Sequence, residues 1–433
     1  MKFRINLLVA SLFFSSGLTY ALTEEWMKSA VNDQYNEAVQ IRQDIHQHAE
    51  LGNQEFRTQK VVVEFLKKQG IDVVTGWKHA PTAVIGIINP DKNNTIALRT
   101  ELDALPVKEN TGLPFASTMS GKYHGKEVPV SHMCGHDVHM AMLMSAAKIL
   151  QQNKDKFDNR IVLIFQPAEE GDSLHAPFDK NAPLSGANAL VHDGLIEKYN
   201  IKHVFGIHVM ARQPAGKIFV ARGAALNSAD VFHIHVEGKQ SHGAMPWAGT
   251  DATLTAANII VGLQQIVSRN ADLSEGMGVI TVGKLNSGET ANVMSGTADM
   301  TGTIRSNNNG VRDTLIKRIP EVADGVAEAA GAKAETRIAK IYPVMMNNPE
   351  LVDKMVPLLK QNGVDAKIST WNPGASEDFS FYAAKVPSMF MFLGADYSDA
   401  KDVQNNHSDK FVVDETTMKT GIMAHLVTAT ARY

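Results

Sequence analysis

The stretch Asn159–Gly171, NRIVLIFQPAEEG, combines a continuous apolar run with two adjacent carboxylates. The run from Ile161 to Phe165 has the length of a strand, and an uninterrupted apolar sequence is typical of a strand covered on both faces of a parallel sheet. After a proline the chain reaches Glu169 and Glu170. Because neighbouring carboxylates repel each other, the pair indicates a site that holds a cation.

Three further apolar runs lead into polar side chains: Ile96–Leu98 before Arg99, Glu101 and Asp103; Val204–Ile207 before His208; and Met389–Leu393 ahead of His407. Helical patterns alternate with these runs, in QKVVVEFLKKQG, where Thr58 is the expected cap, and in VHMAMLMSAAKILQQ. The alternation predicts an open α/β sheet. Ligands of such sheets bind beyond the carboxyl ends of the strands, so we expect these polar side chains to meet at one edge.

The pattern changes between about Ala225 and Lys340. Strands are expected in DVFHIHVEGK, MGVITVGKL and SGTADMTGTIRS, and helices in DATLTAANIIVGLQQIVSR and GVRDTLIKRIPEVADGVAEAAG. This order predicts a small α+β sandwich with helices on one face of an antiparallel sheet. Because an α/β strand follows it, we expect residues 225–340 to be inserted in a larger domain formed by 22–224 and 341–433. His233 and His235 alternate with apolar residues and are expected on the solvated face of a strand.

The N-terminus has the features of a secretory signal peptide over residues 1–21. A basic start precedes an apolar run from Ile5 to Phe14, and the small residues Thr19 and Ala21 occupy the places that a cleavage site needs. A transmembrane anchor is less favoured, because a bilayer needs roughly 20 apolar residues. We therefore expect an exported protein, periplasmic or secreted, with no stable membrane association after cleavage.

Composition narrows the class of ligand. The chain has 433 residues, more than one compact core usually holds, so two domains are expected. Its net charge is −4, with both signs mixed. This balance gives no broad basic surface for nucleic acid or anionic lipid, so a small-molecule ligand is expected.

The only cysteine, Cys134, lies among histidines in VSHMCGHDVHM. A single cysteine excludes an intrachain disulfide. A lone cysteine is most often a small buried apolar residue. Here His136 lies two residues away, and thiolate and imidazole both bind borderline metals such as zinc. On the residues alone, a packing role and a metal-binding role both stay open.

Nine motifs together resemble the M20 metallopeptidase family, and specifically its amidohydrolase branch of N-acyl amino acid hydrolases, hippurate hydrolases, auxin-conjugate hydrolases and N-acetyldiaminopimelate deacetylases. In order along the chain they are RQDIHQHAELGNQEFRT, LRTELDALPVKE, HMCGHDVHMAML, IFQPAEEG, FGIHV, GKQSHGAMP, ANVMSGTADMTGTIR, SEDFS and NHSDKF. The resemblance covers nearly the whole mature chain. It implies a mostly parallel, zinc-peptidase-like α/β catalytic domain with an inserted lid or dimerisation domain.

The resemblance also implies two divalent metal ions, with a cysteine bridging them and a ligand set of Cys134, His136, Glu170, His208 and His407. Glu169 then matches the general base. Two cations lower the pKa of a shared water, and an unligated glutamate beside them takes its proton and hands it to the leaving nitrogen. Zinc, manganese, cobalt and nickel all stay open as the metal.

Three residues of the inserted segment match further positions of the family. His242, in SHGAMP, matches a histidine that stabilises the oxyanion, often from across a dimer. Asn292 and Arg305 match residues that bind the substrate carboxylate, to which a guanidinium donates two parallel hydrogen bonds. The resemblance therefore implies a homodimer or higher homo-oligomer.

Several positions depart from the family pattern. Ala49 replaces a proline, Glu101 replaces an aspartate, and Asp409 stands where proline is frequent. After Glu170 the chain reads GDSLHAPFDKNAPLSG in place of a glycine-rich loop. None of these changes removes an implied ligand or the base, but the loop leaves the substrate preference open.

The sequence thus predicts a metal-dependent amidohydrolase that cleaves N-acyl amino acids into a carboxylic acid and a free amino acid. A dipeptidase or N-acetyl deacetylase with the same chemistry is the nearest alternative. A non-catalytic protein that keeps the fold and binds metal or ligand is a more distant one. The presence of Glu169 argues against it, since a binding protein has no evident need for an unligated carboxylate beside Glu170.

Overall fold

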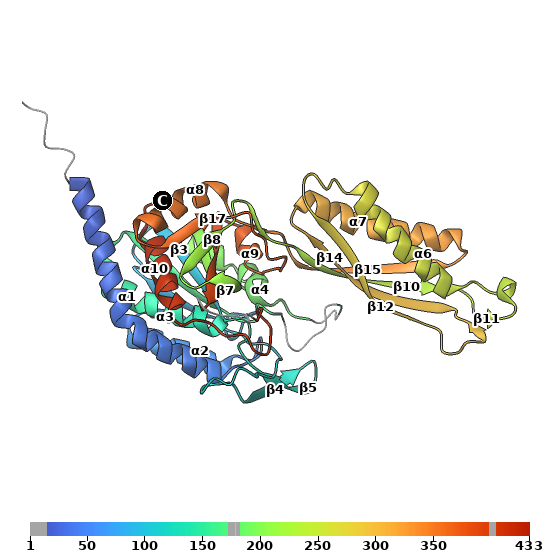
Figure 1. The fold of residues 1–433 in the computed structure, drawn as a ribbon, viewed down its shortest axis with the longest axis horizontal. Coiled ribbons are helices and arrows are strands. Elements are labelled where there is room, and N and C mark those ends of the chain that lie inside the picture. The colour runs from blue at the N-terminus through green and yellow to red at the C-terminus, as the bar shows by residue number, and fades with distance from the viewer. Residues whose placement is uncertain (1–14, 172–177, 179–181, 398–403) are drawn as a thin grey trace, which may run out of the picture.

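The computed structural model describes residues 15–171, 178, 182–397 and 404–433. The chain forms two lobes, each built on its own sheet (Figure 1). The larger sheet has eight strands, in the order β1 (Asp72–Val74), β2 (Val84–Ile88), β6 (Asn159–Gln166), β3 (Asn94–Glu101), β7 (Ile201–Pro214), β18 (Ser388–Asp396), β8 (Lys217–Val220) and β17 (Asp365–Ile368).

The four central strands, β6, β3, β7 and β18, are parallel to one another. They contain the four apolar runs of the sequence, so the predicted α/β sheet is confirmed. Toward the edges the sheet is mixed, because β2 runs antiparallel to β6 and β8 antiparallel to β18. The parallel centre matters for function, since its carboxyl ends share one edge.

Helices cover both faces of this sheet. One face carries α1 (Ser15–Gln47), α2 (Phe56–Lys68), α3 (His136–Gln152), α8 (Pro349–Gln361) and α10 (Thr417–Thr430), and the other carries α4 (Gly186–His192), α5 (Leu195–Tyr199) and α9 (Ser380–Ala383). In β6, Ile161 and Leu163 enter the first core, whereas Val162 and Ile164 enter the second. This two-sided burial explains why the run Ile161–Phe165 is apolar at every position.

The smaller sheet has the order β12 (Gly278–Ser287), β14 (Thr297–Ser306), β10 (Ala229–Glu237) and β15 (Lys333–Tyr342), and every pair is antiparallel. Helices α6 (Ala252–Gln265) and α7 (Asn309–Ala329) pack on one face of it. Five of these elements were predicted, but β15 was not. Its burial alternates imperfectly and it carries Lys333, Glu335, Arg337 and Lys340, which hide the strand pattern.

Short elements complete the fold: hairpin β4 (Met119–Tyr123) and β5 (Lys126–Val130), the pairs β9 (Ala224–Leu226) with β16 (Met345–Met346) and β11 (Ser241–His242) with β13 (Val293–Met294), and the helical turns η1 (Lys154–Lys156), η2 (Pro246–Ala248) and η3 (Ile266–Asn270). The β9–β16 pair lies where the chain passes between the lobes. The domain boundaries at residues 225 and 340 stay predictions.

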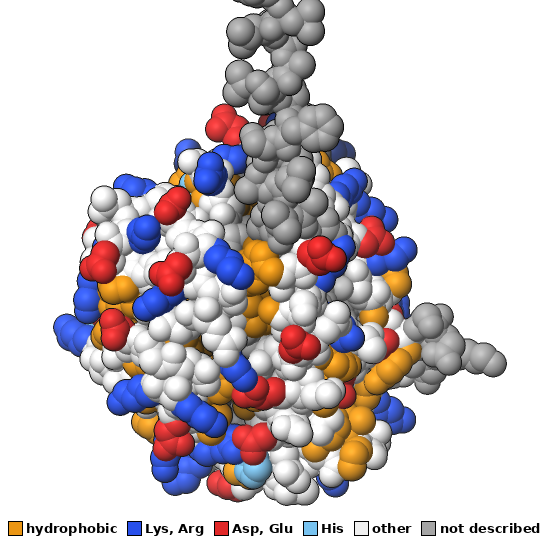
Figure 2. Space-filling view, turned by 90° about the vertical axis from the view of Figure 1, so that its left-hand side faces the viewer, with side chains coloured by type: hydrophobic (Ala, Val, Ile, Leu, Met, Phe, Trp, Pro, Cys, Tyr) orange, Lys and Arg blue, Asp and Glu red, His pale blue; other side chains and the backbone are white. Residues whose placement is uncertain are grey.

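Most of the predicted signal peptide, residues 1–14, lies outside the described residues. Its cleavage and the export of the protein stay predictions. Within the described part of the chain, no helix is long and apolar enough to cross a membrane. On the face of the molecule shown in Figure 2, basic and acidic side chains are interspersed, as the mixed charge of the sequence suggests.

Helix α2 begins at Phe56, so the expected capping by Thr58 is wrong. Thr58 lies in the first turn, where its hydroxyl donates to the Glu50 carboxylate at 2.9 Å. That carboxylate also accepts the backbone N–H groups of Arg57, at 3.0 Å, and of Thr58, at 2.8 Å. Glu50, from the preceding loop, therefore satisfies helix-terminal donors that the sequence pattern assigned to Thr58.

Replacing Glu50 by alanine should lower the free energy of unfolding by about 1 kcal/mol, the usual effect of losing an N-terminal capping group. Urea unfolding followed by circular dichroism measures this change. Glu64→Ala is the matched control, because Glu64 lies on the same helix and is solvent-exposed, 3.9 Å from Lys60. Equal unfolding midpoints for the two variants would show that Glu50 does not cap the helix.

Candidate metal centre

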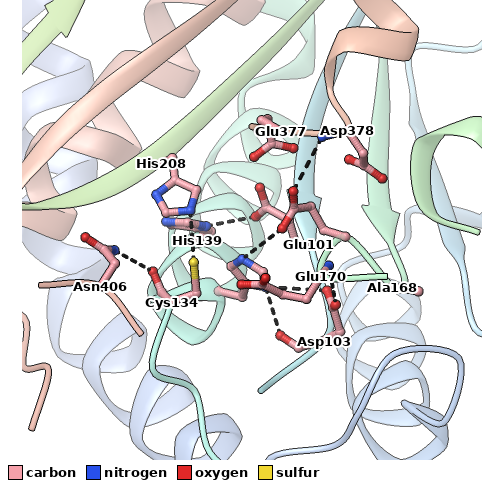
Figure 3. A network of polar contacts seen from close by, with 12 residues as sticks. Glu101, Asp103, Cys134, His139, Ala168, Glu170, His208, Glu377, Asp378 and Asn406 are labelled. Carbon is pink, nitrogen blue, oxygen red and sulfur yellow. Dashed lines mark hydrogen bonds and ion pairs between the residues drawn. The ribbon is translucent and has the colours of Figure 1, made fainter. Parts of the chain in front are cut away.

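The predicted metal ligands come together at the carboxyl edge of the parallel strands. Cys134 and His136 lie at the start of α3, His208 lies in β7, Glu170 follows β6, and His407 lies between β18 and α10. Figure 3 shows the thiol, imidazole and carboxylate groups of this edge facing one another. Segments that are far apart in the sequence thus form one cluster of metal-binding side chains.

Cys134 lies at the middle of this cluster. Its Sγ is 3.3 Å from His208 Nε2 on one side and 3.2 Å from His407 Nε2 on the other. His407 Nε2 also lies 3.0 Å from Glu170 Oε1. Two groups of three donors share the thiol, one with His136 and His208 and one with Glu170 and His407. A thiolate between two such groups has the place that a bridging ligand needs.

Backbone hydrogen bonds orient two of the imidazoles. His208 Nδ1 lies 2.8 Å from the Val209 carbonyl oxygen, and His136 Nδ1 lies 2.8 Å from that of Asp103. Since a carbonyl only accepts, each Nδ1 carries a proton, which leaves Nε2 as the ring nitrogen that could bind an ion. These Nε2 atoms are the ones that face the cluster.

One buried polar atom of the cluster, His136 Nε2, lacks a hydrogen bond. Unsatisfied buried groups are rare in proteins and are often explained by an ion. Burial and the charges of Glu170 and Glu169 raise the pKa of the Cys134 thiol well above its usual value. A bound cation reverses that effect and deprotonates a coordinating thiol. The donor set therefore fits divalent metal of borderline softness.

Glu169 lies beside the cluster. Its Oε2 is 3.8 Å from His136 Nε2, and its side chain is 6% exposed. Burial raises its pKa well above the usual range, and the negative charges of Glu377 and Glu170 add to the effect. A buried carboxyl whose pKa is raised is well suited to take up and release a proton near neutral pH.

The turn between β6 and the acid pair is fixed from two sides. Ala168 adopts a left-handed conformation with φ 51°, and its N–H donates to Glu55 Oε1 at 2.9 Å. The hydroxyl of Tyr342, the last residue of β15, donates to the Glu169 carbonyl oxygen at 2.6 Å. Burial and the charge of Asp103 raise the pKa of Glu55 to about 8.

The segment that carries His407 is also held by hydrogen bonds. The Asn406 side-chain amide donates to the carbonyl oxygens of Cys134 and Val209, both at 3.0 Å. The backbone N–H of His407 donates to Met133 at 2.7 Å, and His407 has a left-handed φ of 70°. These bonds tie the segment to the cysteine that it faces.

His242 and Asn292 lie apart from this cluster, whereas Arg305 lies at the other end of the smaller sheet, next to Ser306, whose carbonyl accepts the Ser228 N–H at 2.7 Å. The N–H of Gly243 donates to the Asn292 carbonyl at 2.8 Å, so His242 and Asn292 are neighbours, and His242 is exposed. Figure 1 shows β11 at the end of the smaller sheet farthest from the larger lobe. Strand β10, which leads there, has nine residues and spans roughly 30 Å at about 3.4 Å per residue.

A small cavity of about 100 Å³ adjoins the cluster, and its walls include Cys134, Glu169, Glu170, His208, Glu377 and His407. His242, Asn292 and Arg305 are not among its lining residues. A larger, shallow hollow of about 510 Å³ lies at the tip of the smaller sheet, next to Gly243 and Val293. Most of the candidate metal ligands, and Glu169, thus adjoin the smaller cavity, and they do not line the larger hollow.

Residues 97–429 match the model of peptidase family M20/M25/M40. The chain belongs to this family. It is 34% identical to thermostable carboxypeptidase 1 of Saccharolobus solfataricus, over 94% of this chain and 98% of that protein. It is also 34% identical to the hippurate hydrolase of Campylobacter jejuni, over 83% and 88%.

Solved structures agree with the assignment. A putative aminohydrolase of methicillin-resistant Staphylococcus aureus superposes with a TM-score of 0.83 at 29% identity, over 93% of this chain and 98% of that one. A Bacillus subtilis protein described as a dinuclear metal-binding peptidase of the M20 family gives 0.74 at 26% identity, over 92% and 98%. This M20 chain is therefore a metal-dependent amide hydrolase with the α/β fold of its family.

Some residues in and around the cluster were not assigned a role from the sequence. Asn406 and Tyr342 had no assigned role, and Glu377 and Asp378 appeared only within the SEDFS motif. The position of Asn406 beside His407 was the one local signal. The loop after Glu170, expected to influence substrate preference, lies mostly outside the described residues.

Replacing Cys134 by serine should lower the affinity for metal, because a hydroxyl is a poorer ligand for a borderline ion. The loss should exceed the roughly 10–100-fold that follows from removing a hydrogen-bonding partner of a ligand. Competition with a chromophoric chelator measures the affinity. Ser145→Ala, a small change in the buried face of the same helix α3, is the control for packing. Unchanged affinity in Cys134→Ser would make the cysteine a packing residue only.

Proposed function

We propose that this M20 hydrolase cleaves N-acyl amino acids into a carboxylic acid and a free amino acid. In this proposal Glu169 is the general base. Two divalent ions are held by Cys134, His136, Glu170, His208 and His407. The observation that carries the proposal is that two carboxyl groups adjoin the donor cluster: Glu170 groups with Cys134 and His407, and the buried Glu169 is a second acid close to His136 and Glu170. A pure binding site has no need for that extra acid.

Bound divalent ions supply Lewis-acid polarisation of the amide carbonyl and lower the pKa of a water. The chain's own residues do the rest. Glu169 takes a proton from the attacking water and returns it to the leaving nitrogen. Tyr342 and the N–H of Asp378, which lies 3.4 Å from Glu169 Oε1, hold the glutamate in position. The apolar walls of the cavity, Phe390 and Phe392 among them, limit access of bulk water.

We further propose that residues 225–340 act as a lid and dimerisation domain, and that His242 acts on the centre of a second copy of the chain. His242 is exposed at a tip remote from the cluster of its own chain. This position supports the proposal that its side chain enters the centre of another subunit. The imidazole then donates a hydrogen bond to the oxyanion. Asn292, its neighbour, and Arg305 on β14 bind the substrate carboxylate.

A second candidate, cleavage of the C-terminal residue of a peptide, is favoured by the 34% identity to a carboxypeptidase over 94% of this chain. Both reactions break an amide next to a free α-carboxylate, so the same residues serve either.

Free-amine release from N-acetyl, N-benzoyl and longer N-acyl amino acids and from dipeptides, with protein loaded separately with zinc, manganese, cobalt or nickel, tests the reaction. We expect turnover of acyl amino acids, reduced about 10²–10⁴-fold in Glu169→Gln because an amide takes up no proton. Metal content, measured in parallel, should be unchanged. Turnover of dipeptides alone would select the second candidate, and full activity of Glu169→Gln would refute the role of the base.

Mixing two inactive variants, Glu169→Gln and His242→Ala, tests the dimer. If His242 acts across a two-fold interface, half of the dimers after subunit exchange are hybrids, and each has one intact centre. Activity should then recover to about one quarter of the wild-type value. No recovery, with hybrid formation verified by differently tagged chains, would mean that His242 acts within its own chain or not at all.

A further inference from the structure

A second group of metal-binding side chains lies away from the cluster of Cys134. It consists of His79, in the connection between β1 and β2, and of His192 and Asp193, at the end of α4. One ligand atom of each residue lies within 4.8 Å of the other two. Small movements of the side chains would bring all three to coordination distance from one ion, about 2.0–2.2 Å for zinc.

Two of the three side chains hold each other in place. The Asp193 carboxylate accepts the backbone N–H of His79 at 2.9 Å and lies 2.5 Å from His79 Nδ1. The side chains of His79 and Asp193 are 23% and 8% exposed. Burial alone would raise the pKa of Asp193, but the hydrogen bonds from His79 lower it below the usual value, so the carboxylate is ionised.

His192 gives this pair a third donor with access to solvent. Its ring meets the His79 ring edge to face, with centroids 5.0 Å apart, and the residue is exposed. Among the hydrogen bonds of the described residues, none involves the His192 ring. Its nitrogens therefore stay available to an ion arriving from solution.

Another group of two histidines and an aspartate, on β10 and β14, differs from this one in its neighbours. On β10, His233 and His235 both approach Asp299, at 3.1 and 2.9 Å. There, however, the Arg337 guanidinium donates to His233 Nδ1 at 3.2 Å, which occupies one nitrogen and places a positive charge at the site. In the described part of the chain, no lysine or arginine forms an ion pair with Asp193.

We propose that His79, His192 and Asp193 form a further divalent-metal site, separate from the dinuclear centre and selective for borderline ions such as zinc. Two imidazoles and one carboxylate form a ligand set that zinc accepts, with a fourth position left for water. The ion takes the place of the proton between His79 Nδ1 and Asp193. Binding cross-links the β1–β2 connection to the end of α4 and stabilises the folded chain through mass action.

The test compares His192→Ala with wild type. This substitution removes one ligand from an exposed position and leaves the His79–Asp193 pair intact. His48→Ala is the matched control, because the His48 side chain is 41% exposed and lies 3.5 Å from an aspartate, Asp44. Each protein is equilibrated with excess Zn²⁺, passed over a desalting column, and analysed by mass spectrometry for zinc per chain.

We expect His192→Ala to hold one zinc ion fewer than wild type and His48→Ala. A second measurement uses Co²⁺, whose sulfur-to-metal charge-transfer band reports on Cys134. His192→Ala should keep this band, which locates the lost ion away from the dinuclear centre. Equal zinc content in wild type and His192→Ala, an equal loss in His48→Ala, or loss of the sulfur band would each overturn the proposal.

Discussion

One buried guanidinium, that of Arg99, organises the acidic edge of the sheet. Its Nη2 lies 2.9 Å from Glu377 and 2.6 Å from Asp378, its Nη1 pairs with Glu101, and its Nε donates to Gln166 at 2.9 Å. All of these groups are buried, so the carboxylates would repel one another strongly without the cation. Arg99 thus allows Glu101, Glu377 and Asp378 to lie beside Glu169 and the metal-binding cluster.

The same guanidinium is linked to His208 of the cluster through a chain of hydrogen bonds. Glu101 Oε2 accepts from His139 Nδ1 at 2.8 Å, and His139 Nε2 accepts the N–H of Val209 at 2.8 Å. The Val209 carbonyl in turn fixes the tautomer of His208. Both nitrogens of His139 are thus engaged in hydrogen bonds, through which this histidine supports the cluster. The longer side chain of Glu101, in place of the family's aspartate, reaches Arg99 and His139 together.

Features with a local sequence pattern, such as the strands and the polar residues at their ends, were mostly predicted from the sequence. The four central strands were predicted because both faces of each are covered, and the cluster was predicted because the carboxyl ends of parallel strands meet. Residues whose role arises only from contacts between distant segments were not predicted. Asn406 closes the His407 segment onto Cys134, and Glu50 reaches forward to cap α2. Single amides and loop carboxylates have no period or spacing that marks such contacts before the chain folds.

The smaller sheet reaches the turn of Glu169 at one end and the segment of His242 at the other. At one end Tyr342, opposite Ala229 in the β15–β10 pair, donates to the Glu169 carbonyl. Burial raises the pKa of Tyr342 well above its usual value, so the hydroxyl stays a donor. At the other end the sheet leads to His242. One sheet therefore contacts the backbone of the proposed base at one end and leads to His242 at the other.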